Sequence, residues 1–207
     1  MLKKIILGVL GLVLLLVVGF CVVVAMQPSE YSISRSATID APPEVVFAQV
    51  NDFHKWEEWS PWAKLDPNSR ATFAGPTSGE GANFHWSGND EVGEGQMTIT
   101  KSDPHKQIVI KLEFVRPMED TCETVFDLTP HKSGEQTHVS WTMRGKNNFT
   151  GRAVCMFMDM DAMLGGYFEQ GLASMKAIAE KEATAGKDDG AEKPASETSG
   201  EESSTKE

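Results

Sequence analysis

The sequence predicts an α+β protein in which an antiparallel sheet of seven strands precedes one long helix, with a single membrane-spanning helix in front of both. The first observation is an uncharged apolar run from Ile5 to Ala25. The second is a series of seven strand-like stretches between residues 31 and 144, with no helical pattern among the last six. The third is an apolar repeat at every third or fourth position from about Gly151 to Lys181, the spacing of an amphipathic helix.

The apolar run is preceded by Lys3 and Lys4 and is 21 residues long, about 31 Å as a helix, enough to cross a hydrocarbon core of about 30 Å. A cleaved signal peptide has an apolar core of about 7–15 residues, so we expect residues 1–28 to be an uncleaved anchor that contacts the membrane through residues 5–25. Val23-Val24-Ala25 keeps cleavage open as the alternative. The lysines predict a single-pass protein with a cytoplasmic N-terminus and an extracytoplasmic domain, on the periplasmic side of a bacterial inner membrane.

The opposite end of the chain has a different composition. From Thr184 to Glu207 there is no aromatic residue and no Ile, Leu, Val or Met. Such a segment cannot bury enough apolar area to offset the entropy of ordering, so we expect residues 183–207 to be a disordered acidic tail and residues 29–182 to be the folded domain. An acidic docking tail is the alternative. The net charge of −11 argues against a nucleic-acid partner.

Tyr31 to Ile39 alternates between polar and apolar residues and predicts the first strand. Asp40 is a candidate N-cap for a helix that begins at Pro42 or Pro43 and ends at Val50. A second short helix is expected over Phe53 to Glu58, and Ser60-Pro61 ends it because proline disfavours helical geometry in the residue before it.

Six further strands are expected in quick succession, separated by turn-forming pairs such as Gly75-Pro76 and Ser133-Gly134. Together with the first strand they make an antiparallel sheet. The six are Ala71–Ala74, Ala82–Ser87, Gly95–Lys101, Gln107–Phe114, Thr121–Leu128 and Thr137–Arg144.

The last element is the long helix, which is rich in methionine. Gly165-Gly166 interrupts it, at about 1 kcal/mol per glycine relative to alanine. Two interpretations remain open: the pair absorbs a bend when a ligand enters, or it lets another element approach closely.

Catalytic and metal-binding patterns are absent from the sequence. The five histidines show no i, i+4 pair of the kind that holds a metal on a helix, and there is no nucleophile elbow, phosphate loop or dinucleotide fingerprint. We therefore expect no metal, no cofactor and no catalytic residue. Three cysteines are too few for a disulfide framework. Cys122 and Cys155 are expected to be buried free thiols unless the fold brings them within reach of each other.

Asn51 to Trp62 is the most informative segment, since it holds three of the five tryptophans. Tryptophan is large to bury and costly to leave in water, so the segment is either a structural plug or the wall of an apolar cavity. The order of elements around it, with the segments Ala41–Phe47, Trp86–Asn89 and Phe157–Asp161, resembles the polyketide cyclase/dehydrase-type branch of the START-like (SRPBCC) superfamily. The resemblance covers about residues 29–181.

That resemblance implies the helix-grip fold, in which a curved antiparallel sheet closes around the long C-terminal helix and encloses a ligand cavity. It implies binding of a small hydrophobic or amphipathic ligand, lipid-like or polyketide-like. The expected wall residues are Trp56, Trp59, Trp62, Trp86, Phe114, Phe126, Trp141, Met160, Leu164 and Phe168. Two alternatives stay open: a cyclase or hydrolase that uses Glu57, Glu58, Asp159 or a nearby histidine in the same cavity, and a protein-interaction module whose partner is unknown.

Overall fold

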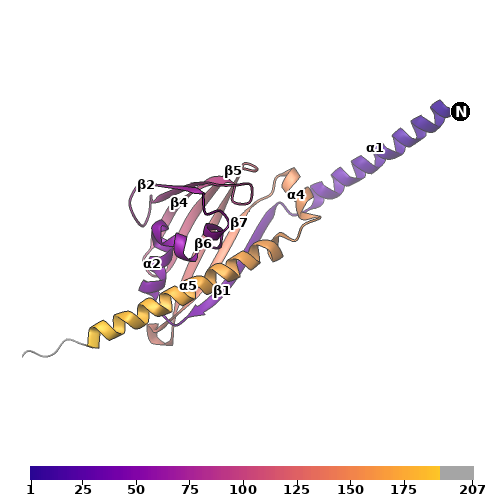
Figure 1. Ribbon diagram of the computed structural model, residues 1–207. Helices are drawn as coiled ribbons and strands as arrows, with labels where there is room; N and C mark the ends of the chain where they lie inside the picture. The colour runs from indigo at the N-terminus through magenta and orange to yellow at the C-terminus, as the bar shows by residue number, and fades with distance from the viewer. Residues whose placement is uncertain (192–207) are drawn as a thin grey trace, which may run out of the picture.

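The computed structural model describes residues 1–191, in which one long helix crosses a seven-stranded sheet and a second helix projects away from the domain (Figure 1). The projecting helix is α1 (Leu2–Met26), and the helix on the sheet is α5 (Met160–Ala191). The strands are β1 (Glu30–Ile39), β2 (Arg70–Ala74), β3 (Asn83–Ser87), β4 (Glu94–Asp103), β5 (Gln107–Arg116), β6 (Asp120–His131) and β7 (Gln136–Lys146). Short helices fill the gaps: α2 (Pro43–Asn51), η1 (Phe53–Lys55), α3 (Trp56–Trp59), η2 (Pro61–Lys64), η3 (Lys132–Gly134) and α4 (Phe149–Cys155).

The sheet is antiparallel throughout, in the order β1-β7-β6-β5-β4-β3-β2. Each strand from β2 to β7 pairs with its neighbour in sequence, and β1 joins the sheet beside β7, where Ile33 lies opposite Met143. The predicted fold is confirmed. In β4, β5 and β7 the alternation of the sequence gives each strand one apolar face, which is buried.

Register shifts in β4 introduce curvature near one edge of the sheet. One lies between Ile99 and Lys101 and the other between Glu94 and Gly95, and such bulges bend a strand and increase its twist. At Gly95 a Cβ atom would lie 2.6 Å from the ring of Trp86, so only glycine lets that indole lie flat across the strand.

The core lies between the sheet and α5 (Figure 1), and α2 and α3 also contact α5. Alternate residues of the central strands are fully buried, as the pattern predicts. The largest fully buried aliphatic side chains are Ile39, Ile99, Ile108, Ile110, Leu172 and Met175. At about 1.5–3 kcal/mol for each large apolar side chain, their burial is a major contribution to the stability of the fold.

The helix predicted over residues 151–181 is two helices, and this part of the prediction was wrong. Asn148 accepts a hydrogen bond from the amide of Gly151 at 2.8 Å and caps α4, whereas Asp159 accepts one from the amide of Ala162 at 2.9 Å at the start of α5. Two caps mean two helix beginnings, and the chain turns between them. The helix α5 also continues to Ala191 instead of ending near Lys181, so residues 183–191 of the expected tail are helical. Residues 192–207 lie outside the described residues.

Two further details differ from expectation. Asp40 does not cap α2, whose N-cap is Pro42; the Asp40 carboxylate accepts a hydrogen bond from Gln136 instead, and the Asp40 amide donates to Glu180 at 2.8 Å. Cys155 is exposed, although Cys122 is buried as expected, and both are free thiols.

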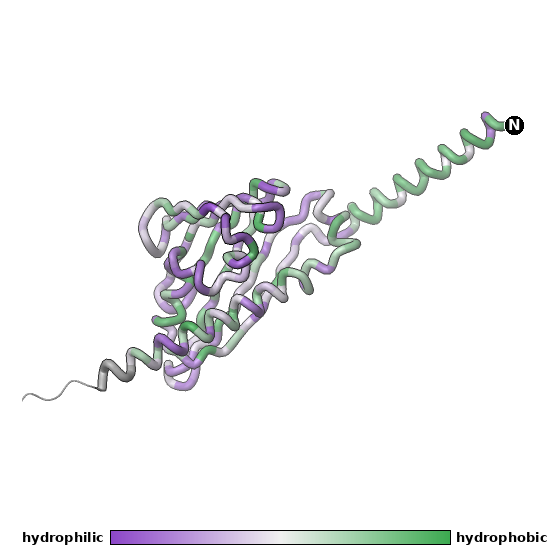
Figure 2. The backbone as a smooth tube through the Cα atoms, viewed as in Figure 1, coloured by the Kyte–Doolittle hydropathy of each residue, from purple (hydrophilic) through white to green (hydrophobic). Residues whose placement is uncertain are grey.

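The helix α1 is long and apolar enough to cross a membrane, and its position near the N-terminus is also that of a signal sequence. Its surface is hydrophobic along nearly its whole length (Figure 2). Apart from Val24, its large apolar side chains are exposed. Packing against the described part of the domain therefore does not explain why this helix is so apolar.

Candidate functional site

Half of the expected wall residues form a close-packed aromatic cluster, which we call the core cluster: Trp56, Trp59, Phe126, Trp141 and Phe168. Trp141 is its centre. Its ring stacks on Phe168, with centroids 4.2 Å apart and planes 7° apart, and on Phe126 at 4.9 Å. Trp59 meets Trp141 edge-on at 5.6 Å, and no member is more than 5% exposed. These rings fill the space between one another.

Hydrogen bonds fix the orientation of the three indoles in the core cluster. Trp56 and Trp59 donate to the carbonyl oxygens of α2, each at 3.0 Å, and Trp141 donates to the hydroxyl of Thr124 at 2.9 Å. Close approach of α5 is possible because position 171 is glycine, where a Cβ atom would lie 2.8 Å from Trp141. A buried indole with its N–H satisfied has little freedom to rotate, so the cluster is rigid.

The other half of the expected wall residues is only partly buried, and we call it the rim set: Trp62, Trp86, Phe114, Met160 and Leu164. Trp86 meets Phe114 edge-on at 5.9 Å, and Trp62 meets the core cluster at Trp141, 6.0 Å away. Met160 and Leu164 occupy the first turns of α5. The rim set therefore leaves large apolar surfaces in reach of a bound molecule.

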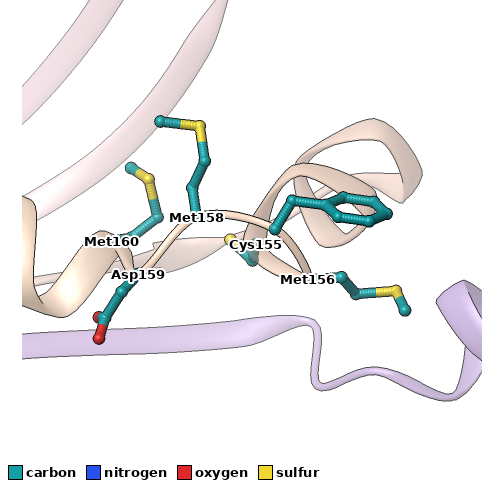
Figure 3. A pocket seen from close by; sticks show the side chains of 6 residues that line it. Cys155, Met156, Met158, Asp159 and Met160 are labelled. Carbon is teal, nitrogen blue, oxygen red and sulfur yellow. The ribbon is translucent and has the colours of Figure 1, made fainter.

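A hollow of about 410 Å³ lies at the turn between α4 and α5 (Figure 3). Met158 and Met160 point to one side of the turn and Asp159 to the other. The hollow is lined by Cys155, Met156, Phe157, Met158, Asp159 and Met160. Of these, only Met160 was predicted from the sequence as a site residue. The spacing of the methionines fits one continuous helix as well as it fits two helices with a turn between them. The signal in the sequence that could have revealed the turn is the pair of cap residues, Asn148 and Asp159.

A second hollow, of about 550 Å³, is lined by residues of β4, β5, β6 and β7, several of which carry charged side chains. Lys111, Glu123 and Arg144 line it, and the last two form a salt bridge. None of the expected wall residues contributes to this hollow.

Arg35 attaches the first turns of α5 to β1. Its guanidinium donates to Asp161 at 3.0 Å and to Glu169 at 2.9 Å, and its hydrogen bonds hold the pKa of the Asp161 carboxyl below its usual range. Gly165 lies directly over this group, and a Cβ atom there would overlap the guanidinium, whereas Gly166 has open space beside it. Of the two interpretations of the glycine pair, the contact at Gly165 favours close approach of another residue over bending of the helix. The helix α5 is continuous through Gly165 and Gly166.

The acidic residues weighed as catalytic groups do not converge. Glu57 and Glu58 are exposed on α3, between the buried Trp56 and Trp59, and Asp159 caps α5. Among the described residues, no group of three His, Cys, Asp or Glu side chains is arranged to hold a metal ion.

The half-buried Tyr31 and the buried Cys122 both lie opposite Gly145 of β7, where β1 enters the sheet. Burial raises the pKa of the Cys122 thiol to about 11, and it raises the pKa of the Tyr31 phenol above its usual range. The ring of Tyr31 lies over Gly145, where a Cβ atom would be 2.7 Å from the phenol oxygen. Both groups are therefore neutral at physiological pH.

A curved antiparallel sheet that holds a long C-terminal helix over its apolar face defines the helix-grip class of START-like proteins. The family described as polyketide cyclase / dehydrase and lipid transport has a model that matches residues 30–180. The chain belongs to this family.

Solved structures share the fold at low sequence identity. A protein of unknown function from Staphylococcus aureus aligns with a TM-score of 0.56 and 9% identity, over 76% of this chain and 98% of its own. A protein from Nitrosospira multiformis gives 0.54 and 18%, over 74% and 99%. The Aha1 dimer from Colwellia psychrerythraea gives 0.51 and 19%, over 72% and 96%. A search of curated proteins gave no match.

Proposed function

We propose that this protein is a membrane-anchored binder of a small hydrophobic or amphipathic ligand, lipid-like or polyketide-like, which it holds without chemical change between the sheet and the first turns of α5. The observation that carries the proposal is the rim set, because five large apolar side chains remain partly exposed and one of them, Met160, lines an open hollow. Ligand pockets are about 300–1,000 Å³ and mainly apolar, and the hollow of about 410 Å³ falls in this range.

Binding without chemistry is supported by the arrangement of the charged groups. General acid–base catalysis needs a titratable group within hydrogen-bond reach of the reacting atom. Glu57 and Glu58 lie on the solvent side of α3, and the Asp159 carboxylate is engaged as a helix cap. Lipid transport, one half of the family's description, requires only an apolar site and a route into it.

The second part of the proposal is that α1 remains attached and crosses the membrane, with the N-terminus in the cytoplasm and the domain outside it. Lys3 and Lys4 precede the span, and positively charged residues favour the cytoplasmic side. The length of the apolar run supports a span over a cleaved signal.

The ligand site can be tested by photo-crosslinking of the full chain, in detergent, with a fatty acid that carries a diazirine near the end of its acyl chain. We expect labelled peptides to contain rim-set residues. Replacing Leu164 by Trp fills the site and reduces that labelling, whereas Gln170→Trp, on the exposed side of the same helix, leaves it unchanged. Labelling confined to residues 5–25, with no effect of Leu164→Trp, would refute ligand binding by the domain.

A further inference from the structure

An exposed apolar surface covers α4 and its connection to α5. Phe157 is 77% exposed, which is unusual for so large an apolar side chain in a folded domain. We call this surface the α4 patch, and it consists of Phe149, Val154, Met156, Phe157, Met158 and Met163. Contiguous exposed apolar side chains mark a contact surface, and the question is what covers this one.

The α4 patch is continuous with the proposed membrane span. The ring of Phe157 stacks on that of Phe20 in α1, with centroids 6.4 Å apart. Arg152 of α4 donates to the backbone oxygen of Ala25 at 3.0 Å, and Val24 is fully buried. In Figure 1, α4 lies beside the domain end of α1. Whatever surrounds the end of α1 therefore also surrounds the α4 patch.

These contacts set a depth. The apolar run from Ile5 to Ala25 matches a hydrocarbon core of about 30 Å, which puts Ala25 at its outer boundary. Phe20 lies five residues before Ala25, about 8 Å inside that boundary at about 1.5 Å per residue. Phe157, stacked on Phe20, lies at the same depth. Arg152, bonded to Ala25, lies at the boundary, where an arginine reaches lipid headgroups.

In hydrocarbon each unsatisfied polar group costs several kcal/mol, and three amides of the connection are paired. The amides of Met156, Phe157 and Met158 all donate to carbonyl oxygens of α4, at 3.3, 2.9 and 3.1 Å. No charged residue lies between Arg152 and Asp159. The turn therefore exposes apolar side chains while keeping its amide donors paired.

We infer that α4 and the α4–α5 connection insert into the outer leaflet of the membrane that α1 crosses, so that lipid acyl chains cover the α4 patch. The inference rests on the proposed anchor. An insertion of about 8 Å agrees with the depth of interfacial helices, about 5–10 Å. The hollow at the connection then opens into the leaflet, and an apolar ligand reaches the first turns of α5 from the lipid rather than from water.

The test uses the full chain in phosphatidylcholine vesicles, with a nitroxide label at one introduced cysteine at a time. Cys21 and Cys155 are first replaced by Ala, and the buried Cys122 is kept. The labelled variants are Phe157→Cys, Val13→Cys in the middle of α1 as the lipid control, and Glu135→Cys in the exposed turn after η3 as the water control. Relaxation enhancement by oxygen, which concentrates in lipid, is compared with that by a water-soluble nickel complex.

We expect the label at 157 to resemble the label at 13, with high oxygen and low nickel accessibility, and to differ from the label at 135. Met158→Cys provides a second reporter on the same turn and is expected to agree. Labels at 157 and 158 that resemble the water control, while the label at 13 is in lipid, would overturn the insertion and leave the anchor intact. A water-exposed label at 13 would overturn the anchor and the insertion with it.

Discussion

Truncation of Trp141 measures whether the core cluster supports the fold or the ligand. The Trp141→Ala variant removes a side chain that is 2% exposed and stacked on two rings. Large aromatic-to-alanine changes in a core cost about 3–5 kcal/mol. For a domain of this size each kcal/mol lowers the melting temperature by roughly 2–4 °C, so we expect a fall of about 6–20 °C.

A second substitution separates the contributions of Trp141. Trp141→Phe keeps an aromatic ring in the stack but loses the hydrogen bond to Thr124. The hydroxyl of Thr124 also donates to the carbonyl oxygen of Thr142 at 3.2 Å, so it keeps one partner. We expect a cost of about 1–2 kcal/mol from the lost bond and the smaller ring. The matched rim variant, Trp86→Ala, costs less than Trp141→Ala because Trp86 is only partly buried.

The assay is urea unfolding of the full chain in mild detergent, followed by near-ultraviolet circular dichroism, which reports tertiary packing around the aromatic rings. The same variants are tested for labelling by the photoreactive fatty acid. Trp86→Ala is expected to lose labelling at small cost in stability, and Trp141→Ala to lose stability. If the free energy of unfolding of Trp141→Ala were within about 1 kcal/mol of that of the unmodified chain, the core cluster would not be packed as described.

Three further predictions concern α5, the buried thiol and the anchor. Gly165→Ala should lower the melting temperature because its methyl group displaces the Arg35 guanidinium. Gly166→Ala has open space beside it and should stabilise the fold by about 0.4–1 kcal/mol. Equal effects of the two substitutions would contradict the close contact between Gly165 and Arg35. The free energy of unfolding should fall by about 2–3 kcal/mol between pH 9 and 11, because the pKa of the Cys122 thiol is near 9.0 in the unfolded chain and about 11 in the folded one. Urea titrations of Cys122→Ala should lack this part of the pH dependence. An alkaline-phosphatase reporter fused after residue 207 should be active outside the cytoplasm; activity of a fluorescent cytoplasmic reporter instead would reverse the topology.

Local pattern was sufficient to predict most of the sheet. The alternation in residues 107–114 predicted β5, which extends only two residues further, because a strand with one buried face must alternate. The pairing of β1 with β7, by contrast, joins residues about a hundred positions apart. No local pattern contains that information, and this pairing was not predicted from the sequence.

The candidate site was harder to predict than the sheet. Composition identified ten large apolar residues but could not divide them into the core cluster and the rim set, since both halves have the same chemistry. Trp59 and Trp62 are three residues apart, yet one is 1% exposed and the other only partly buried. That difference depends on which side of each ring α5 covers. The spacing of Met156 and Phe157 was ambiguous in the same way. It fits the apolar face of a helix, and it also fits an exposed turn between two helices.

The connection between α1 and β1 limits where this protein can act. It consists of Gln27, Pro28 and Ser29, which span at most about 10 Å when fully extended. The amide of Asn147 also donates to the carbonyl oxygen of Ser29, at 2.6 Å, which holds the connection at its β1 end. With α1 anchored as proposed, a domain on so short a tether does not travel to a second membrane with a bound ligand. Under the same proposal, a ligand that leaves for another compartment needs a diffusing acceptor that comes to the bilayer.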